Sequence, residues 1–200
     1  MYTETMSKEV NGRKAEYDVN DLFLKRHSPR ALSGEPIAKD EIMTLFEAAC
    51  WAPSSFNEQP WRFIYAVRGT SEFETFFSFL VNYNKSWCVR ASVLIVTISK
   101  KNFNYNNKEN VNHSSDTGAA WENLALQTHM MGLVAHGMNG FDYGRAKTEL
   151  GIPDDYQVEM MIAIGKHGNI EDLPEDMRAD EKPNDRRPLN QIVFEGKFRG

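Results

Sequence analysis

Apolar side chains recur along this chain at the spacings of helices and strands, and the clearest case lies between residues 40 and 51. Ile42, Leu45, Phe46 and Ala49 fall at positions i, i+3, i+4 and i+7, on one face of a helix. Pro53 then ends that helix. Similar patterns predict helices over 18–25, over 71–81 behind a Ser71-x-x-Glu74 capping box, over 116–131 and over 143–150.

Strands are predicted where β-branched and aromatic residues alternate or form short apolar runs. Residues 61–67 alternate, whereas the apolar run within 92–99 is typical of a strand buried on both faces. Another strand is predicted over 158–164, and a turn or irregular strand over 133–141. Helices and strands interspersed without a regular βαβ series indicate an α+β fold rather than a doubly wound sheet.

The length of the chain fits one domain covering residues 1–200. Residues 1–17 are polar and charged, and we expect them to form a flexible N-terminus. Residues 102–112 contain six asparagines and are predicted to be an exposed loop or lid. From residue 167 the chain is polar, so 167–200 is predicted to be an extended C-terminal arm that packs on a partner subunit.

Composition excludes several classes of partner. The net charge of −5 argues against nucleic acid, and the longest apolar run, Val93 to Ile98, is too short to span a membrane. Cys50 and Cys88 lack CxxC spacing, which argues against a disulfide scaffold and is typical of a reducing compartment. We therefore expect a cytoplasmic protein with two buried thiols that act as small hydrophobic groups.

The sequence lacks the usual motifs of several site types. There is no GxGxxG and no HExxH. Residues 132–137 have the outer glycine spacing of a P-loop, but Met138 and Asn139 stand where Lys and Ser or Thr belong. The adjacent residues 113–116 include His, Ser and Asp but cannot form a triad by sequence alone. We predict no metal ligand and no catalytic side chain.

Three segments do suggest a ligand. Arg26, Ser28 and Arg30 alternate before and after Pro29 and could hold a phosphate, although a solvated basic turn has the same composition. Residues 53–61 form a turn-rich loop that could face a planar ligand or simply join a helix to a strand. Two more arginines lie at 186 and 187, in what could also be a solvated cluster. Together the three segments suggest a phosphorylated heteroaromatic cofactor.

The chain resembles the flavin-dependent nitroreductase family. The matching residues are Arg26-x-Ser28-x-Arg30, Ala52-Pro53-Ser54-Ser55-x-Asn57-x-Gln59-Pro60-Trp61, Asn84-x-x-Trp87, Gly137-Met138-Asn139-Gly140-Phe141 and Arg186-Arg187-Pro188-Leu189. The resemblance implies a nitroreductase-like α/β sandwich with a central, mostly antiparallel sheet flanked by helices. It also implies an intertwined homodimer with FMN at the subunit interface.

The resemblance also implies roles for individual residues. Arg26, His27, Ser28 and Arg30 would contact the FMN phosphate, ribityl chain and pyrimidine edge. The loop with Pro53, Ser54, Ser55, Asn57 and Gln59 would come from the other subunit and meet the isoalloxazine. Asn84 would reach the flavin edge, Asn139 and Gly140 the ring, and Arg186 or Arg187 the phosphate.

The activity implied is that of an FMN-dependent oxidoreductase. NADH or NADPH would reduce the flavin, which would pass electrons to a nitroaromatic, quinone or related small-molecule acceptor by ping-pong hydride transfer. The sequence does not choose between the two nicotinamides. A non-catalytic flavin-binding or storage protein stays open as an alternative. So does a specialised family chemistry, such as flavin fragmentation or reductive dehalogenation, for which the 102–112 segment would be the cue.

Overall fold

The computed structural model describes residues 8–199, which form two compact units. The larger unit contains residues 28–181, and the smaller one contains the described residues up to 27 together with those from 182. The single domain expected from the chain length stays a prediction, and the two units are described separately below.

The larger unit is built on one four-stranded sheet whose strand order is β3–β4–β6–β5. Its strands are β3 (Trp61–Val67), β4 (Val93–Lys100), β6 (Tyr156–Lys166) and β5 (Leu133–Met138), and all neighbours are antiparallel. The predicted α+β class with a central antiparallel sheet is therefore confirmed. β4 is buried along nearly its whole length, as its apolar run predicted, whereas β5 is a regular strand where a turn or irregular strand was expected.

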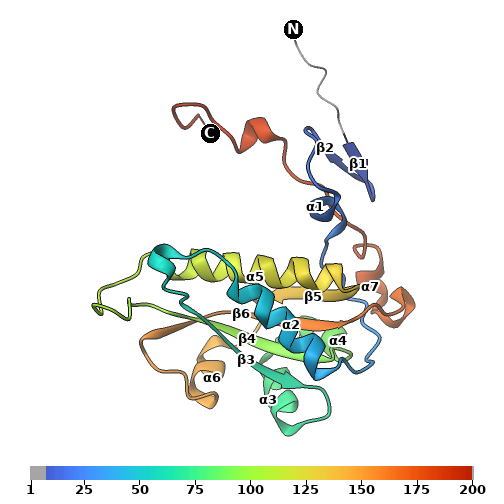
Figure 1. Ribbon diagram of the computed structural model, residues 1–200. Helices are drawn as coiled ribbons and strands as arrows, with labels where there is room; N and C mark the ends of the chain where they lie inside the picture. Colours follow the sequence, from blue (N-terminus) through green and yellow to red (C-terminus); the bar gives the residue numbers. More distant parts are fainter. Residues whose placement is uncertain (1–7, 200) are drawn as a thin grey trace. The chain divides into compact units, whose positions relative to one another are not determined.

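Helices cover both faces of this sheet (Figure 1). On one face lie α2 (Lys39–Cys50) and α5 (His113–Met130), whose apolar residues share a core with one side of the strands. On the other face lie α3 (Ser71–Phe79), α4 (Asn82–Cys88) and α6 (Tyr143–Glu149). Ile42, Leu45 and Ala49 are buried on α2, as the helical spacing predicted.

In the larger unit, the cap of α3 and the start of α5 differ from the predictions. Thr70 caps α3, because its hydroxyl accepts from the amide of Phe73, so the predicted Ser71-x-x-Glu74 capping box is wrong. The long helix α5 begins at His113, three residues before the predicted start. The predicted buried state of both thiols is also wrong for Cys50, which is exposed at the end of α2, whereas Cys88 is buried.

The C-terminal part of the larger unit is folded rather than extended. A 3₁₀ turn η2 (Ile170–Asp172) and the short helix α7 (Glu175–Arg178) follow β6. Leu173 and Met177 are buried in the core beneath α3 and α4. The segment 167–181 thus packs within its own chain, and packing of the remaining tail on a partner subunit stays a prediction.

The smaller unit contains a hairpin that the sequence analysis did not predict. Strands β1 (Lys8–Val10) and β2 (Arg13–Ala15) pair antiparallel around Asn11 and Gly12, which have φ values of 55° and 74°. Positive φ at both turn residues is the reason that Asn-Gly favours tight hairpins. Part of the expected flexible N-terminus is therefore a hairpin, and residues 1–7 lie outside the described part.

The smaller unit also contains α1 (Asp21–Lys25) and the 3₁₀ turn η3 (Leu189–Gln191). Asn20 caps α1, because its side chain accepts from the amide of Leu22. No helix within residues 8–199 is long and apolar enough to cross a membrane.

Candidate functional site

In the larger unit, a chain of side-chain contacts joins three of the segments singled out in the sequence. The amide nitrogen of Asn84 on α4 donates to the carbonyl of Gly140, with Nδ2 and O 2.9 Å apart. The Asn84 carbonyl oxygen accepts from the indole of Trp87 at 3.3 Å. The Trp87 ring lies 4.6 Å from that of His136 on β5, whose Nδ1 donates to the carbonyl of Pro29 at 3.2 Å.

These contacts place the predicted residues Asn84 and Gly140 side by side and link them to the Ser28–Arg30 segment. Gly140 is the residue that this packing requires. A Cβ at Gly140 would lie 2.6 Å from Nδ2 of Asn84, closer than real Cβ contacts, and 3.0 Å from a methyl carbon of Val81, which is also a tight contact. The close approach of α4 to the end of β5 therefore depends on a residue without a side chain.

His136 is held in its neutral form. Burial lowers its pKa below the ordinary value of 6.5, and the positive charge of Arg30 acts in the same direction. The carbonyls of Pro29 and Ser28 and the carboxylate of Glu181 oppose this shift.

Arg30 is held by a carboxylate from the far end of the larger unit. Oε1 of Glu181 accepts from the backbone amides of Arg30 at 2.5 Å and of Ala31 at 2.6 Å. Its other oxygen lies 3.6 Å from the Arg30 guanidinium, and the Glu181 side chain is only 2% exposed. Glu181 therefore fixes the backbone of the segment that follows Ser28.

In the smaller unit, a buried arginine gathers the N-terminal and C-terminal candidate residues. Arg13 is 4% exposed, and its Nε donates to the carbonyl of Asn184 at 2.8 Å. Its Nη1 donates to the carbonyls of Leu24 at 3.0 Å and Arg26 at 2.5 Å. The guanidinium of Arg13 therefore joins the backbone at Arg26 to the backbone at Asn184, which is two residues before Arg186.

The charges around Arg13 are mostly positive. The pKa of Arg13 is lowered, first by burial and then by the charges of Arg186 and Arg26, while Asp185 acts in the opposite direction. Arg13, Arg26 and Arg186 thus form a cluster of like charges, which an anion would stabilise. Arg186 and Arg187 are both exposed.

The predicted ring-facing loop lies between α2 and β3 and contains the 3₁₀ turn η1 (Ser55–Asn57). Asp116 on α5 accepts from the amide of Ser55 at 3.0 Å, and the hydroxyl of Ser54 accepts from the amide of Gln59 at 3.0 Å. Gln59 donates in turn to the carbonyl of Asn57 at 3.1 Å. These bonds close the loop on itself and attach it to α5.

The remaining predicted residues have simpler surroundings. His27 lies in the smaller unit, where its Nδ1 donates to the carbonyl of Lys25 at 3.3 Å. Asn139 and Pro53 are exposed, and the carbonyl of Asn139 accepts from the amide of Phe141 at 3.0 Å. The structure therefore brings Ser28, Arg30, Asn84 and Gly140 together in the larger unit, and Arg26 and Arg186 around Arg13 in the smaller one.

The sequence analysis missed Arg13, Glu181 and His136 as parts of the site. Arg13 follows the Asn-Gly turn, so a hairpin prediction would have placed it beside Lys14 on a strand, but nothing in the sequence shows that it is buried. Glu181 lies about 150 residues from its partners.

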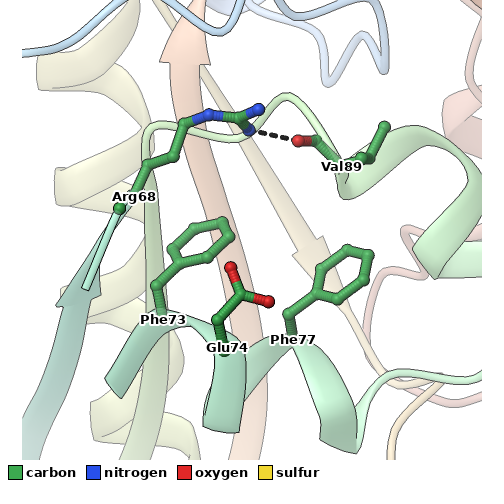
Figure 2. Close-up of a pocket in the computed structure, with 6 residues that line it drawn as sticks. Arg68, Phe73, Glu74, Phe77 and Val89 are labelled. Atoms are coloured by element: carbon green, nitrogen blue, oxygen red, sulfur yellow. Dashed lines mark hydrogen bonds between the residues drawn. The ribbon is translucent and has the colours of Figure 1, made fainter. Parts of the chain in front are cut away.

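Two other features of the larger unit are separate from this site. One is a cavity of about 230 Å³ lined by residues of α3 and by Arg68 and Val89. Figure 2 shows Phe73 and Phe77 of α3 below Arg68, whose guanidinium donates to the carbonyl of Val89. None of the predicted residues lines this cavity. At the start of α5, Nδ1 of His113 lies 2.7 Å from the hydroxyl of Ser99, but Ser99 is fully buried and cannot reach a substrate.

Comparison with known proteins places this fold and site in a class. The sequence profile of the Nitroreductase family matches residues 23–74 and 71–166. A crystal structure described as an oxidoreductase containing FMN has a TM-score of 0.93 and 42% identity, and the match covers 96% of this chain and 99% of that one. The chain belongs to the Nitroreductase family.

Two curated relatives extend the comparison. An Archaeoglobus fulgidus protein, provisionally named NADH dehydrogenase/NAD(P)H nitroreductase, is 29% identical over 172 residues, which cover 82% of this chain and 91% of the relative. An uncharacterised 15.4 kDa protein of Mycolicibacterium smegmatis is 33% identical over 84 residues. That second match spans 42% of this chain and 56%, or about half, of the relative.

Proposed function

We propose that this protein is an FMN-dependent NAD(P)H oxidoreductase that reduces quinones, nitroaromatics or related acceptors. Membership of the Nitroreductase family supports an oxidoreductase, and the similarity to a structure containing FMN supports that cofactor. The name of the Archaeoglobus fulgidus relative supports a nicotinamide as the reductant. The net reaction with a quinone is NAD(P)H, a proton and the quinone giving NAD(P)⁺ and the hydroquinone.

The observation that carries the proposal is the cluster around Arg13. Arg26 and Arg186 are residues that the resemblance assigned to the phosphate or its surroundings. Arg13 donates to the backbone carbonyl of Arg26 and shares the side-chain oxygen of Asn184 with Arg186. A dianionic phosphate is the group that such a donor set fits, because guanidiniums bind phosphate oxygens through pairs of charge-assisted hydrogen bonds. Arg13 and Arg186 donate to the same side-chain oxygen of Asn184, at 3.3 Å and 3.1 Å, so we assign the phosphate to Arg186.

The residues that the resemblance assigned to the flavin ring lie in the larger unit. Ser28, Arg30, Asn84, Asn139 and Gly140 would hold the ring and its pyrimidine edge. His136 and Glu181 would position them through the carbonyl of Pro29 and the amide of Arg30. The loop with Pro53, Ser54, Ser55, Asn57 and Gln59 would come from a second copy of the chain, which makes a homodimer part of this proposal.

Bound FMN would supply the redox chemistry by taking up two electrons and passing them to the acceptor. The side chains of this protein would bind and orient the reactants. A neutral, partly buried His136 adds no second positive charge beside Arg30, whose guanidinium faces the carboxylate of Glu181. No side chain of the site needs to act as a nucleophile or metal ligand.

The phosphate assignment is tested by comparing FMN with riboflavin, which has the same ring system and no phosphate. We expect apoprotein to bind FMN more tightly than riboflavin in a fluorescence titration. Arg26→Ala should weaken FMN binding by about 1.5–3 kcal/mol, the range for losing a charged hydrogen-bond partner, and leave riboflavin binding unchanged. Equal affinities for the two flavins would contradict the phosphate site, and binding of neither would contradict the proposed function.

A further inference from the structure

The side chain of Glu181 is a buried carboxylate in the larger unit. It is only 2% exposed, and its Oε1 accepts from the backbone amides of Arg30 and Ala31. Its Oε2 is also buried and has no hydrogen-bond partner among the described residues. That oxygen lies 3.6 Å from Nη1 of Arg30, which is too long for a hydrogen bond but close enough for an ion pair. The free oxygen of Glu181 therefore interacts with Arg30 through charge.

The short helix α7 places Glu181 at this position. Met177 of α7 is 4% exposed and belongs to the core beneath α3 and α4. The guanidinium of Arg178 donates to the carbonyl of Leu173 at 3.0 Å, and the amide of Glu181 donates to the carbonyl of Arg178 at 3.3 Å. Packing and hydrogen bonds within the larger unit thus determine where the carboxylate lies.

The backbone that Glu181 contacts is also held by other bonds. The carbonyl of Ala31 accepts from the amide of Gly168 at 2.9 Å, and Leu32 forms a β-bridge with His167. A Cβ at Gly168 would lie 2.4 Å from the carbonyl carbon of Leu32, so these two stretches of backbone are in close contact. A neutral glutamine at position 181 would offer the same kind of acceptor oxygen at a lower cost of burial. Holding the backbone therefore does not by itself explain a carboxylate at this position.

The charges of Glu181 and Arg30 balance each other. His136 is neutral because burial lowers its pKa, and Arg30 and Glu181 act on that pKa in opposite directions. The formal charges are thus one positive on Arg30, one negative on Glu181 and none on His136. A charge that is shielded from water acts on its neighbours more strongly than it does in solution. Removing the charge of Glu181 would therefore leave the positive charge of Arg30 without its counterion.

We propose that Glu181 lowers the reduction potential of the bound flavin by balancing the charge of Arg30. The inference rests on the proposed function, which places Arg30 at the pyrimidine edge of FMN. Hydride transfer from NAD(P)H gives NAD(P)⁺ and a reduced flavin with one more negative charge. A positive charge at that edge stabilises the reduced flavin more than the oxidised one, and the carboxylate of Glu181 offsets this effect. Glu181 thus makes the reduced flavin a stronger reductant toward the acceptor.

The test measures the reduction potential of the FMN-saturated protein against a reference dye, in an anaerobic titration without a nicotinamide. Glu181→Gln removes the charge and keeps an acceptor oxygen. We expect the ratio of the affinities for reduced and oxidised FMN to rise about tenfold, which is about 30 mV for a two-electron couple. Glu181→Asp keeps the charge and should stay close to the parent protein. Asp180→Asn is a matched control, because it removes one negative charge from the adjacent, exposed residue.

A second pair of variants tests the inference even if Glu181→Gln alone does not fold. Arg30→Gln should lower the affinity ratio, and Arg30→Gln combined with Glu181→Gln, which buries neither charge, should raise it again about tenfold. An unchanged potential in Glu181→Gln, or equal potentials in the double variant and Arg30→Gln, would overturn the inference. A rise in Glu181→Asp or Asp180→Asn equal to that in Glu181→Gln would also overturn it. A parent protein that binds no FMN would instead contradict the proposed function.

Discussion

The guanidinium of Arg13 donates to the backbone carbonyl of Arg26, with Nη1 and O 2.5 Å apart. The same guanidinium is bound to the carbonyl of Asn184, near the opposite end of the chain. Arg13 is buried, and its guanidinium donates to backbone carbonyls rather than to a carboxylate. Its hydrogen bonds therefore hold the backbone at Leu24, Arg26 and Asn184 in place. Arg13 is therefore a positioning residue of the proposed phosphate site.

Replacing Arg13 should weaken FMN binding without removing a direct ligand. Arg13→Ala leaves the carbonyls of Leu24, Arg26 and Asn184 without their donor, and each lost hydrogen bond costs about 1 kcal/mol. We expect FMN affinity to fall about five- to tenfold in a fluorescence titration. Arg13→Lys keeps the charge but not the fork of donors and should restore only part of the affinity.

Lys14→Ala is the matched control for that experiment. It removes one positive charge from the next residue of the same strand, and the Lys14 side chain is 74% exposed. FMN affinity in this variant should match that of the parent protein. If Lys14→Ala and Arg13→Ala weaken FMN equally, general electrostatics rather than positioning explains the effect.

The packing of α4 against the end of β5 predicts the effect of a single methyl group. Gly140→Ala would place Cβ 2.6 Å from the Asn84 amide, so either side chain must move. We expect the free energy of unfolding to fall by about 1–3 kcal/mol, measured by urea denaturation. Gly118→Ala in α5 meets no atom within 4 Å and should be neutral or stabilising by up to about 1 kcal/mol. Equal effects of the two variants would show that Asn84 does not require glycine at 140.

The buried His136 predicts a loss of stability in mild acid. Its pKa in the folded protein lies below the ordinary 6.5 because burial disfavours the charged ring, so the unfolded chain binds more protons as the pH falls. Its contribution to stability is complete above pH 6.5 and is lost as the pH falls toward the folded pKa. His136→Phe keeps a ring against Trp87 but does not titrate, so its unfolding free energy should depend less steeply on pH. The difference in slope is at most about 1.4 kcal/mol per pH unit. Identical slopes in the two proteins would mean that His136 is not held neutral.

The two thiols should differ in reactivity. Cys88 is fully buried, its sulfur lies 3.4 Å from that of Met138, and burial raises the pKa of its thiol. Cys50 is exposed. Titration with 5,5′-dithiobis(2-nitrobenzoate) should therefore detect one thiol in the native protein and two after denaturation. Cys50→Ser should leave the native protein unreactive, and rapid reaction of that variant would contradict the buried state of Cys88.

The helices and strands that could be predicted from the sequence are those whose spacing of apolar residues shows which face is buried. The helical spacing of Ile42, Leu45 and Ala49 on α2 required one buried face, and the apolar run of β4 required two. Helix α4 was not predicted because Asn82, Asn84 and Ser86 lower its helix propensity. Its stability comes instead from packing of Trp87 and Cys88, which only the tertiary structure reveals.

Some residues of the candidate site could likewise be predicted from the sequence, and others could not. The continuous motif over residues 52–61 can be recognised in the sequence by itself, and Arg26 and Arg186 could be singled out by residue type. The residues that hold these segments in position could not be identified from the sequence. Arg13 alternates with Lys14 as on a solvated strand, and Glu181 lies in a charged tail, yet both are shielded from solvent by distant segments. The Asn11-Gly12 turn is the exception, because that signal was present and not used.

The most direct test of the proposed function is the visible spectrum of the FMN-loaded protein under anaerobic conditions. Addition of NADH or NADPH should bleach the flavin absorbance, and subsequent addition of 1,4-naphthoquinone should restore it. Bleaching and recovery would also exclude a storage protein. A bound flavin whose spectrum does not change with either nicotinamide would contradict the account.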